Sequence, residues 1–383
     1  MKLLNSSTTQ PARPGGFVHG LAAPSATLAP ALTAQEVLNW GDFELCNDCE
    51  FEMTEDVRLG DGDGPGIIEA DHMRAAWNEE LGYLVFPLGG TGIKIFDHDG
   101  TFEREIGTEG EGPGEFRSIW DLDVMDKRIV VLEGGRKTLV MLSPAGEYIT
   151  QHRYQHPEGG QVTPVGEGMV VMFATTWRTR VMEHPLHLID LSRGATTLLF
   201  GAANAGAEVA DIQFNTGKRV AGSVLSRSGT VWWGWNATPG VQEWSVEGEF
   251  LRYIEGELPW FPEITEMPDL SREPPATLLT GLALDADDNL WMAVRTADPA
   301  WDDLPLEPTR VGHAVPDGRE DEYYDTRLDV FSLRERRHLG GHVWDSADGR
   351  LLDRGGEPAV YVPEFDNAMV PQIVIYRARP AGR

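Results

Sequence analysis

IKIFDHDGTFEREIG, residues 93–107, is the stretch of sequence that decides the fold. Apolar and polar residues alternate on both sides of a short polar turn that ends in Gly100, which is the period-two pattern of two strands in a hairpin. The same pattern returns in residues 139–154, 186–201 and 241–256. The turn glycines recur at spacings of 46, 48 and 54 residues: Gly100, Gly146, Gly194 and Gly248. A period in the forties predicts a fold built from repeated β units.

A second pair of strands precedes each of these hairpins. Residues 281–295, GLALDADDNLWMAVR, show it most clearly, because a polar turn separates two apolar runs. Residues 120–134 and 224–235 repeat the arrangement. Four strands per unit at this period are typical of the blade of a β-propeller.

The number of units predicts six blades. Five units contain all four strands, whereas the last one, with PAVYVPEF (358–365) and QIVIYRAR (372–379), lacks its outer strand. Residues 50–62 form an orphan outer strand, and we predict that residues 50–60 complete the last blade by pairing with residues 373–377. Closure of this kind removes the exposed edges of an open sheet. The predicted fold is all-β: a six-bladed β-propeller of four-stranded antiparallel blades, closed by an N-terminal strand.

The links between the first blades resemble those of a known propeller family. IGTEGEGPGEF (106–116) and the shorter LGDGDGPG (59–66) resemble the inter-blade link of NHL-repeat propellers, and the strands and FDHDG turn that follow match the same pattern. The resemblance is good over residues 57–155, and only the spacing persists towards the C-terminus. It implies a six-bladed ring but no particular reaction, because such folds host binding modules and enzymes alike.

The charge of the chain excludes some classes of partner. Its 383 residues include 32 basic and 61 acidic ones, which gives a formal net charge of −29. Such a surface repels phosphate backbones and anionic lipids, so nucleic acid is not an expected partner, even though some NHL proteins bind RNA. The chain contains no run of 18 apolar residues, so membrane insertion is not expected. We expect a monomer whose partner is a protein or a small polar ligand.

The N-terminal part of the chain lies outside the repeat. Residues 1–49 are predicted to be a disordered leader or a degraded export signal, and residues 50–383 to be the propeller. Residues 17–34 are small and mildly apolar, as in a signal sequence, but His19 and two prolines interrupt the apolar core that such a signal needs.

Cys46 and Cys49 are the only cysteines of the chain. A zinc site would need two further ligands, and the acidic neighbours Glu44, Asp48 and Glu50 disfavour a reactive thiolate. In an exported protein we expect a short disulfide at the entry to the closing strand, and in a cytosolic protein two free thiols. An extracytoplasmic location, periplasmic or secreted, is favoured over the cytoplasm.

Two long insertions interrupt the repeat. Residues 257–276 link the fourth and fifth blades, and residues 296–325 separate the second and third strands of the fifth blade. Because the strands of a blade alternate in direction, both insertions should emerge on the face that also carries the links between blades. Aromatic residues such as Trp260 and Trp301 are costly to leave in solvent, which favours a lid over the mouth of the channel. In the alternative, the insertions fold outward over the outer strands.

Shorter loops on the same face complete the candidate site. Besides Trp260 and Trp301, its expected residues are Arg136, Trp177, Arg178, Trp235, Asn236, Asp366 and Asn367. Arginine, aromatic and amide side chains together suit a polar or sugar-like ligand. We therefore favour a non-enzymatic recognition scaffold that binds a protein, peptide or small polar ligand on this loop face. The alternative is a divalent-metal-dependent, lactonase-like or lyase-like enzyme with its site in the central channel.

No cofactor, catalytic residue or metal ligand is assigned from the sequence. Gly107–Gly114 lacks the Lys-Ser/Thr pair and the helix of a phosphate-binding loop. Asp285–Asn289 is expected in a hairpin turn and lacks the downstream glutamate of an EF-hand. No set of histidines matches the zinc ligands of NHL-like amidating lyases. Sugar-lactonase-like propellers hold a metal with channel Glu, Asn and Asp residues, which cannot be singled out here, so a divalent cation is left open as an alternative.

Overall fold

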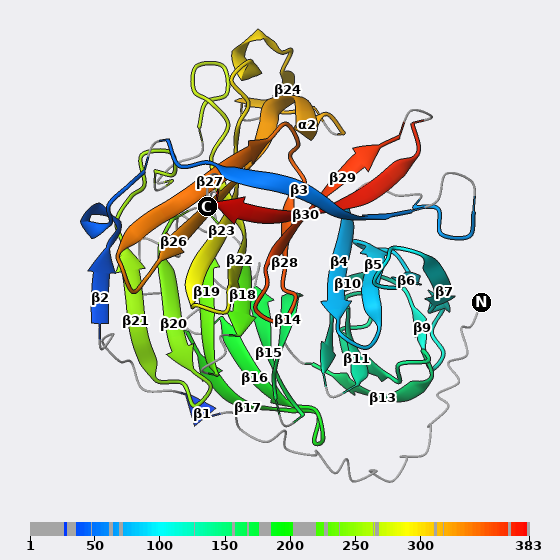
Figure 1. The fold of residues 1–383 in the computed structure, drawn as a ribbon. Helices are drawn as coiled ribbons and strands as arrows, with labels where there is room; N and C mark the ends of the chain where they lie inside the picture. Colours follow the sequence, from blue (N-terminus) through cyan, green and yellow to red (C-terminus); the bar gives the residue numbers. More distant parts are fainter. Residues whose placement is uncertain are drawn as a thin grey trace, which may run out of the picture.

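Six antiparallel sheets, arranged around a ring, contain most of the strands of the computed structural model (Figure 1). The structure describes residues 27–28, 36–46, 48–60, 64–68, 72–125, 127–154, 158–166, 168–175, 185–201, 220–225, 229–236, 238–262, 264, 268–309, 312–316, 318–366 and 369–380. Each sheet contains four antiparallel strands of one blade, so the predicted six-bladed β-propeller is confirmed.

The blades follow one another along the chain, and the strands of blades 1 to 5 pair in sequence order. Blade 1 contains β4 (Met73–Asn78), β5 (Gly82–Pro87), β6 (Ile93–Phe96) and β7 (Phe102–Ile106). Blade 2 contains β10 (Ile119–Met125), β11 (Arg128–Glu133), β12 (Thr138–Leu142) and β13 (Tyr148–Arg153). Blade 3 contains β14 (Glu158–Gly166), β15 (Met169–Thr175), β16 (Leu186–Asp190) and β17 (Ala195–Phe200).

The second half of the ring repeats this order. Blade 4 contains β18 (Val220–Leu225), β19 (Thr230–Trp235), β20 (Val241–Ser245) and β21 (Phe250–Glu255). Blade 5 contains β22 (Leu278–Leu284), β23 (Asn289–Ala297), β26 (Tyr324–Ser332) and β27 (Arg337–Trp344). Blade 6 contains β28 (Arg350–Leu352), β29 (Ala359–Phe365), β30 (Pro371–Pro380) and, from the other end of the chain, β3 (Phe51–Leu59).

The first strand of each blade faces the axis of the ring. Each of these strands contacts the first strands of both neighbouring blades, so that the six surround a central channel: β4, β10, β14, β18, β22 and β28. All of them begin on the face at which the chain arrives from the preceding blade. We call this the link face, and the loops between second and third strands also lie on it because the strands are antiparallel.

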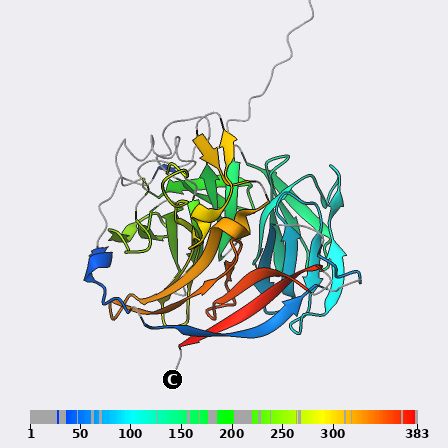
Figure 2. The same cartoon turned by 90° about the horizontal axis from the view of Figure 1, so that it is seen from above.

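Short elements decorate the links. β8 (Thr108–Glu109) and β9 (Glu115–Phe116) pair within the link between blades 1 and 2. The insertion in blade 5 contains η2 (Trp301–Asp303), the hairpin of β24 (Glu307–Thr309) and β25 (Gly312–Ala314), and α2 (Glu320–Tyr323). The hairpin projects from the ring in both views (Figures 1 and 2). Among the described residues, no helix is long and apolar enough to cross a membrane.

The predicted turn glycines are confirmed by their backbone angles. Gly100 and Gly146 both have φ of 84°, a left-handed conformation that favours glycine in a tight turn. At Gly100 a side chain is also excluded by space, because a Cβ there would lie 2.6 Å from the carbonyl oxygen of Arg58 in the neighbouring blade. The repeat glycine therefore fixes both the turn and the approach of the next blade.

The apolar core lies between the blades rather than in the channel. Each of six clusters of buried side chains joins two neighbouring blades, because both faces of every sheet are covered. Leu84 of blade 1 and Ile119 of blade 2 share one such cluster, and Trp233 of blade 4 packs against Phe173 of blade 3 in another. The channel is consequently left to the polar side chains of the first strands.

The ring closes as predicted. β3 pairs antiparallel with β30, with Phe51 opposite Pro380 and Leu59 opposite Ile373. The N-terminal strand thus becomes the outer strand of blade 6, and both strands lie side by side in Figure 1.

The chain before β3 also packs on the ring, which corrects the boundary placed after residue 49. β2 (Glu36–Asn39) pairs in parallel with β21 of blade 4, and Glu44 and Glu50 bridge to β27 of blade 5. We call residues 36–50 the rim segment, because it runs along the outer strands of successive blades and covers edges that would otherwise be exposed. Further upstream, β1 (Thr27–Leu28) pairs with β17 of blade 3, and residues 1–26 and 29–35 lie outside the described residues.

The rim segment is held by apolar packing. Trp40 in η1 (Trp40–Asp42) is fully buried and donates from Nε1 to the carbonyl oxygen of Pro239 at 2.9 Å. Leu38 and Phe43 are buried beside it in the cluster between blades 4 and 5. β2 and Trp40 lie outside the repeat and occur only once, so the repeat pattern of the sequence could not assign them to the propeller.

Candidate functional site

A cavity of about 340 Å³ lies in the central channel. First strands of several blades line it, together with Asn236 after β19 and Arg295 from β23. Seven polar or charged side chains line the cavity, which suits a polar ligand better than an apolar one: Arg74, Asp121, Gln161, Asn236, Thr280, Arg295 and Arg350. A concave site with a few converging polar groups is the default location for ligand binding in a fold of this type.

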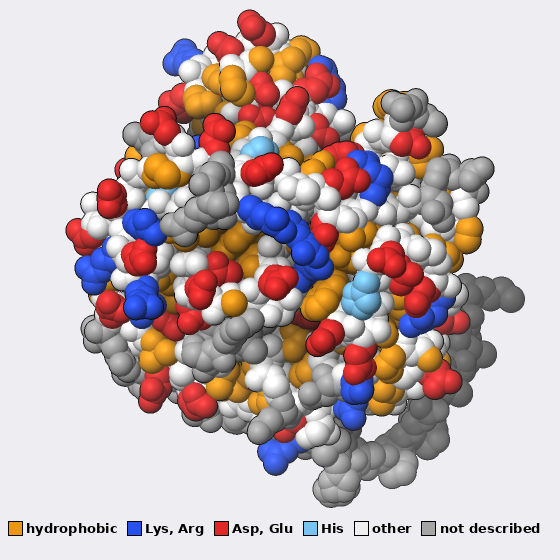
Figure 3. All heavy atoms as spheres, viewed as in Figure 1, with side chains coloured by type: hydrophobic (Ala, Val, Ile, Leu, Met, Phe, Trp, Pro, Cys, Tyr) orange, Lys and Arg blue, Asp and Glu red, His pale blue; other side chains and the backbone are white. Residues whose placement is uncertain are grey.

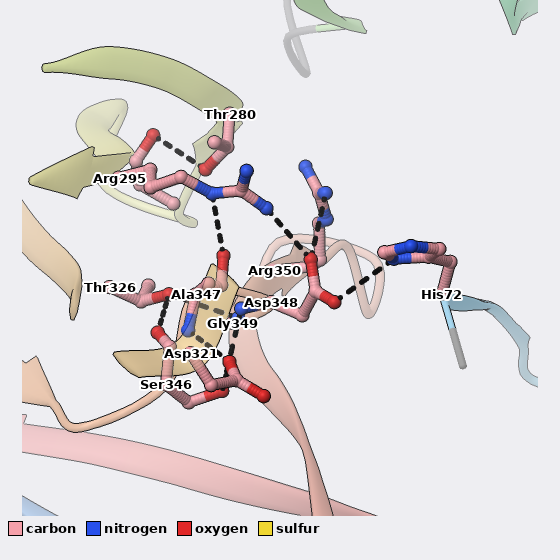
Figure 4. A network of polar contacts seen from close by, with 11 residues as sticks. His72, Thr280, Arg295, Asp321, Thr326, Ser346, Ala347, Asp348, Gly349 and Arg350 are labelled. Carbon is pink, nitrogen blue, oxygen red and sulfur yellow. Dashed lines mark hydrogen bonds and ion pairs between the residues drawn. The ribbon is translucent and has the colours of Figure 1, made fainter. Parts of the chain in front are cut away.

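Three arginines converge in this cavity, which we call the arginine cluster: Arg74 of β4, Arg295 of β23 and Arg350 of β28. Arg295 donates from Nη2 to Asp348 Oδ1 at 2.9 Å, and Arg350 Nη2 lies 3.6 Å from the same oxygen. Figure 4 shows both guanidinium groups pointing toward Asp348. Arg74 makes no hydrogen bond or ion pair within the part of the chain that the structure describes. The cluster therefore holds more positive than negative charge.

Asp348 is the carboxylate on which the cluster is built. His72 Nδ1 lies 3.2 Å from its Oδ2 on the side away from Arg295 (Figure 4). Burial alone would raise the pKa of Asp348, but Arg350, Arg295 and His72 outweigh it and hold the pKa below its usual value. Asp348 is therefore ionised at neutral pH and neutralises one of the arginines.

The remaining positive charge is unfavourable in this cavity. Burial, with Arg74 and Arg295 as like-charged neighbours, lowers the pKa of Arg350 to about 9, against the opposing effects of Tyr361 and Asp348. The Arg350 side chain is only 18% exposed. A guanidinium that is destabilised by burial and by like charges gains most from a bound anion, because the anion supplies the missing counter-charge.

Asp121 of β10 lines the same cavity, and Asp123 lies two residues further along this strand. Burial raises the pKa of Asp121 to about 7, although its carboxylate accepts a hydrogen bond from the Val162 amide at 2.7 Å and is attracted by Arg74. Burial, Asp121 and Asp353 raise the pKa of Asp123 to about 8. Both groups therefore take up or release protons near neutral pH, where the ordinary aspartate is fully ionised.

A single turn connects the arginine cluster to the insertion in blade 5. Asp321 of α2 accepts from the amide of Ala347 at 2.6 Å and from the Ser346 hydroxyl at 3.3 Å. Thr326 of β26 donates to the Ser346 carbonyl oxygen at 2.6 Å and accepts from the Gly349 amide at 3.0 Å (Figure 4). We call residues 345–349 the link turn; these contacts fix the place of Asp348 within it.

Of the residues predicted for the site, Asn236 lines the cavity. Trp235 is buried and packs edge-on against Trp233 between blades 3 and 4. Arg136 serves the link between blades 1 and 2, since it donates to the carbonyl oxygens of Glu111 and Glu115 and to the fully buried Glu133. Trp235 and Arg136 therefore have structural contacts in place of the expected position at the mouth.

The predicted lid does not form as expected. The guanidinium carbon of Arg327 lies 4.1 Å from the centre of the Trp260 ring. The same ring packs against His338 of β27. These contacts place it among the third and fourth strands of blade 5, away from the cavity lining, as the outward-folding alternative predicts. Trp301 lies in η2 of the projecting insertion and makes no ring contact in the described residues. The two tryptophans therefore do not meet over the channel.

The other predicted residues fall outside the cavity or outside the described residues. Asp366 accepts from the Val370 amide at 2.8 Å in the turn between β29 and β30. Trp177, Arg178 and Asn367 are not described. Cys46 and Cys49 form a disulfide at the entry to β3, as expected for an exported protein.

The arginine cluster itself was missed from the sequence. Its members come from blades 1, 5 and 6 and are brought together only by ring closure, so no local motif contains them. One signal was available: each arginine interrupts a strand of small or apolar residues, as in MRAAW, AVRTA and GRLL. A charged residue at such a position has either a partner or a ligand.

Comparisons with known proteins agree on the class of fold. A family model described as a 6-bladed beta-propeller matches residues 83–156, which run from the second strand of blade 1 to the end of blade 2. No curated protein matches the sequence.

Solved structures share the architecture at low sequence identity. A member of the DUF4221 family from Bacteroides vulgatus has a TM-score of 0.56 and 10% identity, covering 87% of this chain and 99% of that chain. A protein from Bacteroides fragilis, named as a predicted exported protein, has a TM-score of 0.53 and 10% identity, covering 90% and 99%. Streptogramin B lyase, with 12% identity, gives a TM-score of 0.45 over 86% and 98%. At 10% identity, the likeness to the two Bacteroides proteins concerns the fold alone.

Proposed function

We propose that the protein is a non-enzymatic recognition scaffold that binds a small anionic ligand, a carboxylate or a phosphate, at the arginine cluster. The observation that carries the proposal is Arg74, which lines the cavity beside two further guanidinium groups and has no hydrogen-bond or ion-pair partner among the described residues. Guanidinium groups bind carboxylate and phosphate in a two-pronged geometry, and such charge-assisted hydrogen bonds are among the strongest in proteins. The ligand would supply a counter-charge to Arg74 and a further one to Arg350, which shares Asp348 with Arg295.

The aspartates of the channel give the proposal a pH dependence. Asp121 and Asp123 have pKa values of about 7 and about 8, so they lose their protons as the pH rises from about 6 to about 9. Their negative charge then competes with a bound anion for Arg74. Anion binding is therefore expected to weaken over this pH range.

Isothermal titration calorimetry with succinate and inorganic phosphate tests the proposal. Arg74→Gln should weaken anion binding about tenfold or more, because one charge-assisted hydrogen bond contributes about 1.5–3 kcal/mol. Its unfolding free energy should stay close to that of the wild type, since the Arg74 side chain has no hydrogen bond or ion pair to lose among the described residues. Arg128→Gln on the exposed start of β11 is the matched control and should bind normally. Equal affinities of wild type and Arg74→Gln would refute the proposal.

An enzyme with its site in the channel is the second candidate. Carboxyl groups with pKa values near 7 inside a polar cavity are typical of general acids and bases, and Asp121 lies within the electrostatic reach of Arg74. A divalent-metal-dependent lactonase-like or lyase-like activity would show as turnover of an anionic lactone or ester. Asp121→Asn should abolish such turnover, whereas in a pure binding protein it should strengthen anion binding.

We also propose an extracytoplasmic location and an NHL-type ancestry for the repeat. The Cys46–Cys49 disulfide supports the location, because disulfides persist in oxidising compartments. The predicted exported protein from Bacteroides fragilis has the same fold. The glycine-rich link at residues 106–116 supports the NHL type. Cell fractionation with antibody detection tests the location, and a purely cytosolic, reduced protein would contradict it.

A further inference from the structure

Three aspartates meet at the base of the insertion in blade 5, outside the arginine cluster. Asp298 directly follows β23, Asp325 is the second residue of β26, and Asp345 opens the link turn after β27. One carboxylate oxygen from each lies within 4.8 Å of one from each of the others. Calcium–oxygen distances of about 2.3–2.6 Å allow ligand atoms this far apart around one ion.

Asp325 gives this group a property that surface acidic clusters lack. The residue is only 9% exposed, yet its side chain makes no hydrogen bond and no ion pair in the part of the chain that the structure describes. Its carboxylate faces those of Asp298 and Asp345 instead. A buried carboxylate with no donor and two like-charged neighbours is costly, and a cation removes that cost. Burial and these two neighbours raise the pKa of Asp325 to about 6.

The two other carboxylates are also available to a cation. Asp298 accepts one hydrogen bond, from the Ala300 amide to Oδ1 at 2.6 Å, and Asp345 forms no ion pair among the described residues. All the ligand atoms are oxygens, which suits a hard divalent cation, and the exposed position of Asp345 leaves room for the waters that complete a shell of six to eight ligands.

We propose that Asp298, Asp325 and Asp345 bind a divalent cation of the calcium class. The ion would join both ends of the insertion, which leaves blade 5 at Asp298 and re-enters it before Asp325, to the first residue of the link turn. This site goes beyond the anion-binding function proposed above and does not depend on it. The role of the bound ion is structural, because it would hold the base of the insertion against the link between blades 5 and 6.

Terbium luminescence and thermal unfolding of the full chain test the proposal. Trp301 lies next to the site, since its amide donates to the Asp298 carbonyl oxygen at 3.1 Å, and it can sensitise bound terbium. After treatment with a chelator, calcium should raise the melting temperature and displace terbium. Magnesium should do so only at higher concentration, because it tolerates irregular geometry poorly.

Matched variants decide the result. Asp325→Asn should weaken terbium and calcium binding about 100-fold, comparable to the largest losses seen when a metal site is perturbed. It should also raise the stability of the metal-free protein, since it removes a buried charge. Asp345→Asn, on an exposed side chain, provides a second variant whose folding is not in question. Asp302→Asn in the same insertion should bind like the wild type. Calcium that fails to raise the melting temperature, or raises it equally in Asp325→Asn, would overturn the proposal.

Discussion

Residues 257–276 and residues 296–325 both depart from the repeat on the link face, but they pack in different ways. The first insertion turns its apolar residues inward: Leu258 and Phe261 are 2% and 0% exposed and join the cluster between blades 4 and 5. The second projects from the ring with its hairpin and is attached at its base through polar contacts, such as those of Asp321 with the link turn, and through the buried Tyr323 of α2 (Figures 1 and 4).

The difference shows that aromatic content does not decide the role of an insertion. Trp260 and Trp301 were both expected over the channel, yet the first packs on Arg327 and the second lies on a projecting loop. The position of the apolar neighbours is more informative. Leu258 and Phe261 flank Trp260 and commit that insertion to the core, whereas Asp298, Asp302 and Asp303 surround Trp301 in sequence. A stabilising insertion and a site-positioning insertion can therefore occur side by side.

The largest effect is expected from Phe261→Ala. Phe261 is fully buried, so its removal leaves a cavity and should lower the free energy of unfolding by about 3–5 kcal/mol. Urea denaturation at neutral pH measures the loss. Trp301→Ala in the other insertion is the control, with an expected change below about 0.5 kcal/mol. Similar losses for both variants would remove the distinction between the insertions.

A smaller, pH-dependent effect is expected from Asp348→Asn in the link turn. The folded-state pKa of Asp348 is held below its usual value, so its ionised form stabilises the fold above about pH 4, and this contribution disappears as the pH falls through the folded-state pKa. The variant should lose about 2 kcal/mol at pH 7, because Arg295 and Arg350 lose their counter-charge. At a pH below the folded-state pKa of Asp348, its stability should approach that of the wild type. Phe261→Ala should instead show the same deficit at both pH values.

Asp321→Ala is expected to cost about 1 kcal/mol, the net contribution of one or two hydrogen bonds. Its effect on function should exceed its effect on stability, since the contacts of Asp321 with Ser346 and Ala347 position the link turn and thereby Asp348. Calorimetry with succinate should show weaker binding than in the wild type. Glu322→Ala, which removes a neighbouring exposed carboxylate of α2, is the matched control. An unchanged anion affinity in Asp321→Ala would separate the insertion from the site.

The smallest change in stability is expected when residues 300–317 are replaced by a short Gly-Ser turn. This excision removes η2 and the hairpin of β24 and β25 but keeps Asp298 and α2. The melting temperature should change little, because these residues contribute no member to the six inter-blade clusters. A large drop in the melting temperature would show that the projecting insertion also stabilises the ring.

Much of the fold could be predicted because the repeat is local. Strand alternation and the turn at Gly100 are visible within 15 residues, and their recurrence defines the blades. Closure by β3 followed from the missing strand of the last blade. The rim segment could not be found in this way, since β2 and Trp40 pair with strands about 200 residues away and occur once.

The candidate site was less predictable for a physical reason. Its loops were chosen by residue type, but a loop tryptophan can be satisfied by packing, as Trp235 is, and a loop arginine by backbone carbonyls, as Arg136 is. What distinguishes Arg74 is that it has no such partner among the residues that the structure describes, and this property exists only in three dimensions. The sequence pattern predicted on which face of the ring the loops lie, and it predicted Asn236 as a site residue. It did not predict the charge balance of the channel.

The closure of blade 6 has a consequence for folding during synthesis of the chain. β3 is synthesised before the other strands of the six blades, whereas its partner β30 is the last of these strands to be made. Until β30 has been made, the hydrogen-bonding edge of β3 is therefore without its partner strand, and the ring cannot close. An unpaired strand edge invites association with other nascent chains. Production of this propeller should accordingly depend more on holding chaperones during elongation than on the stability of the finished ring.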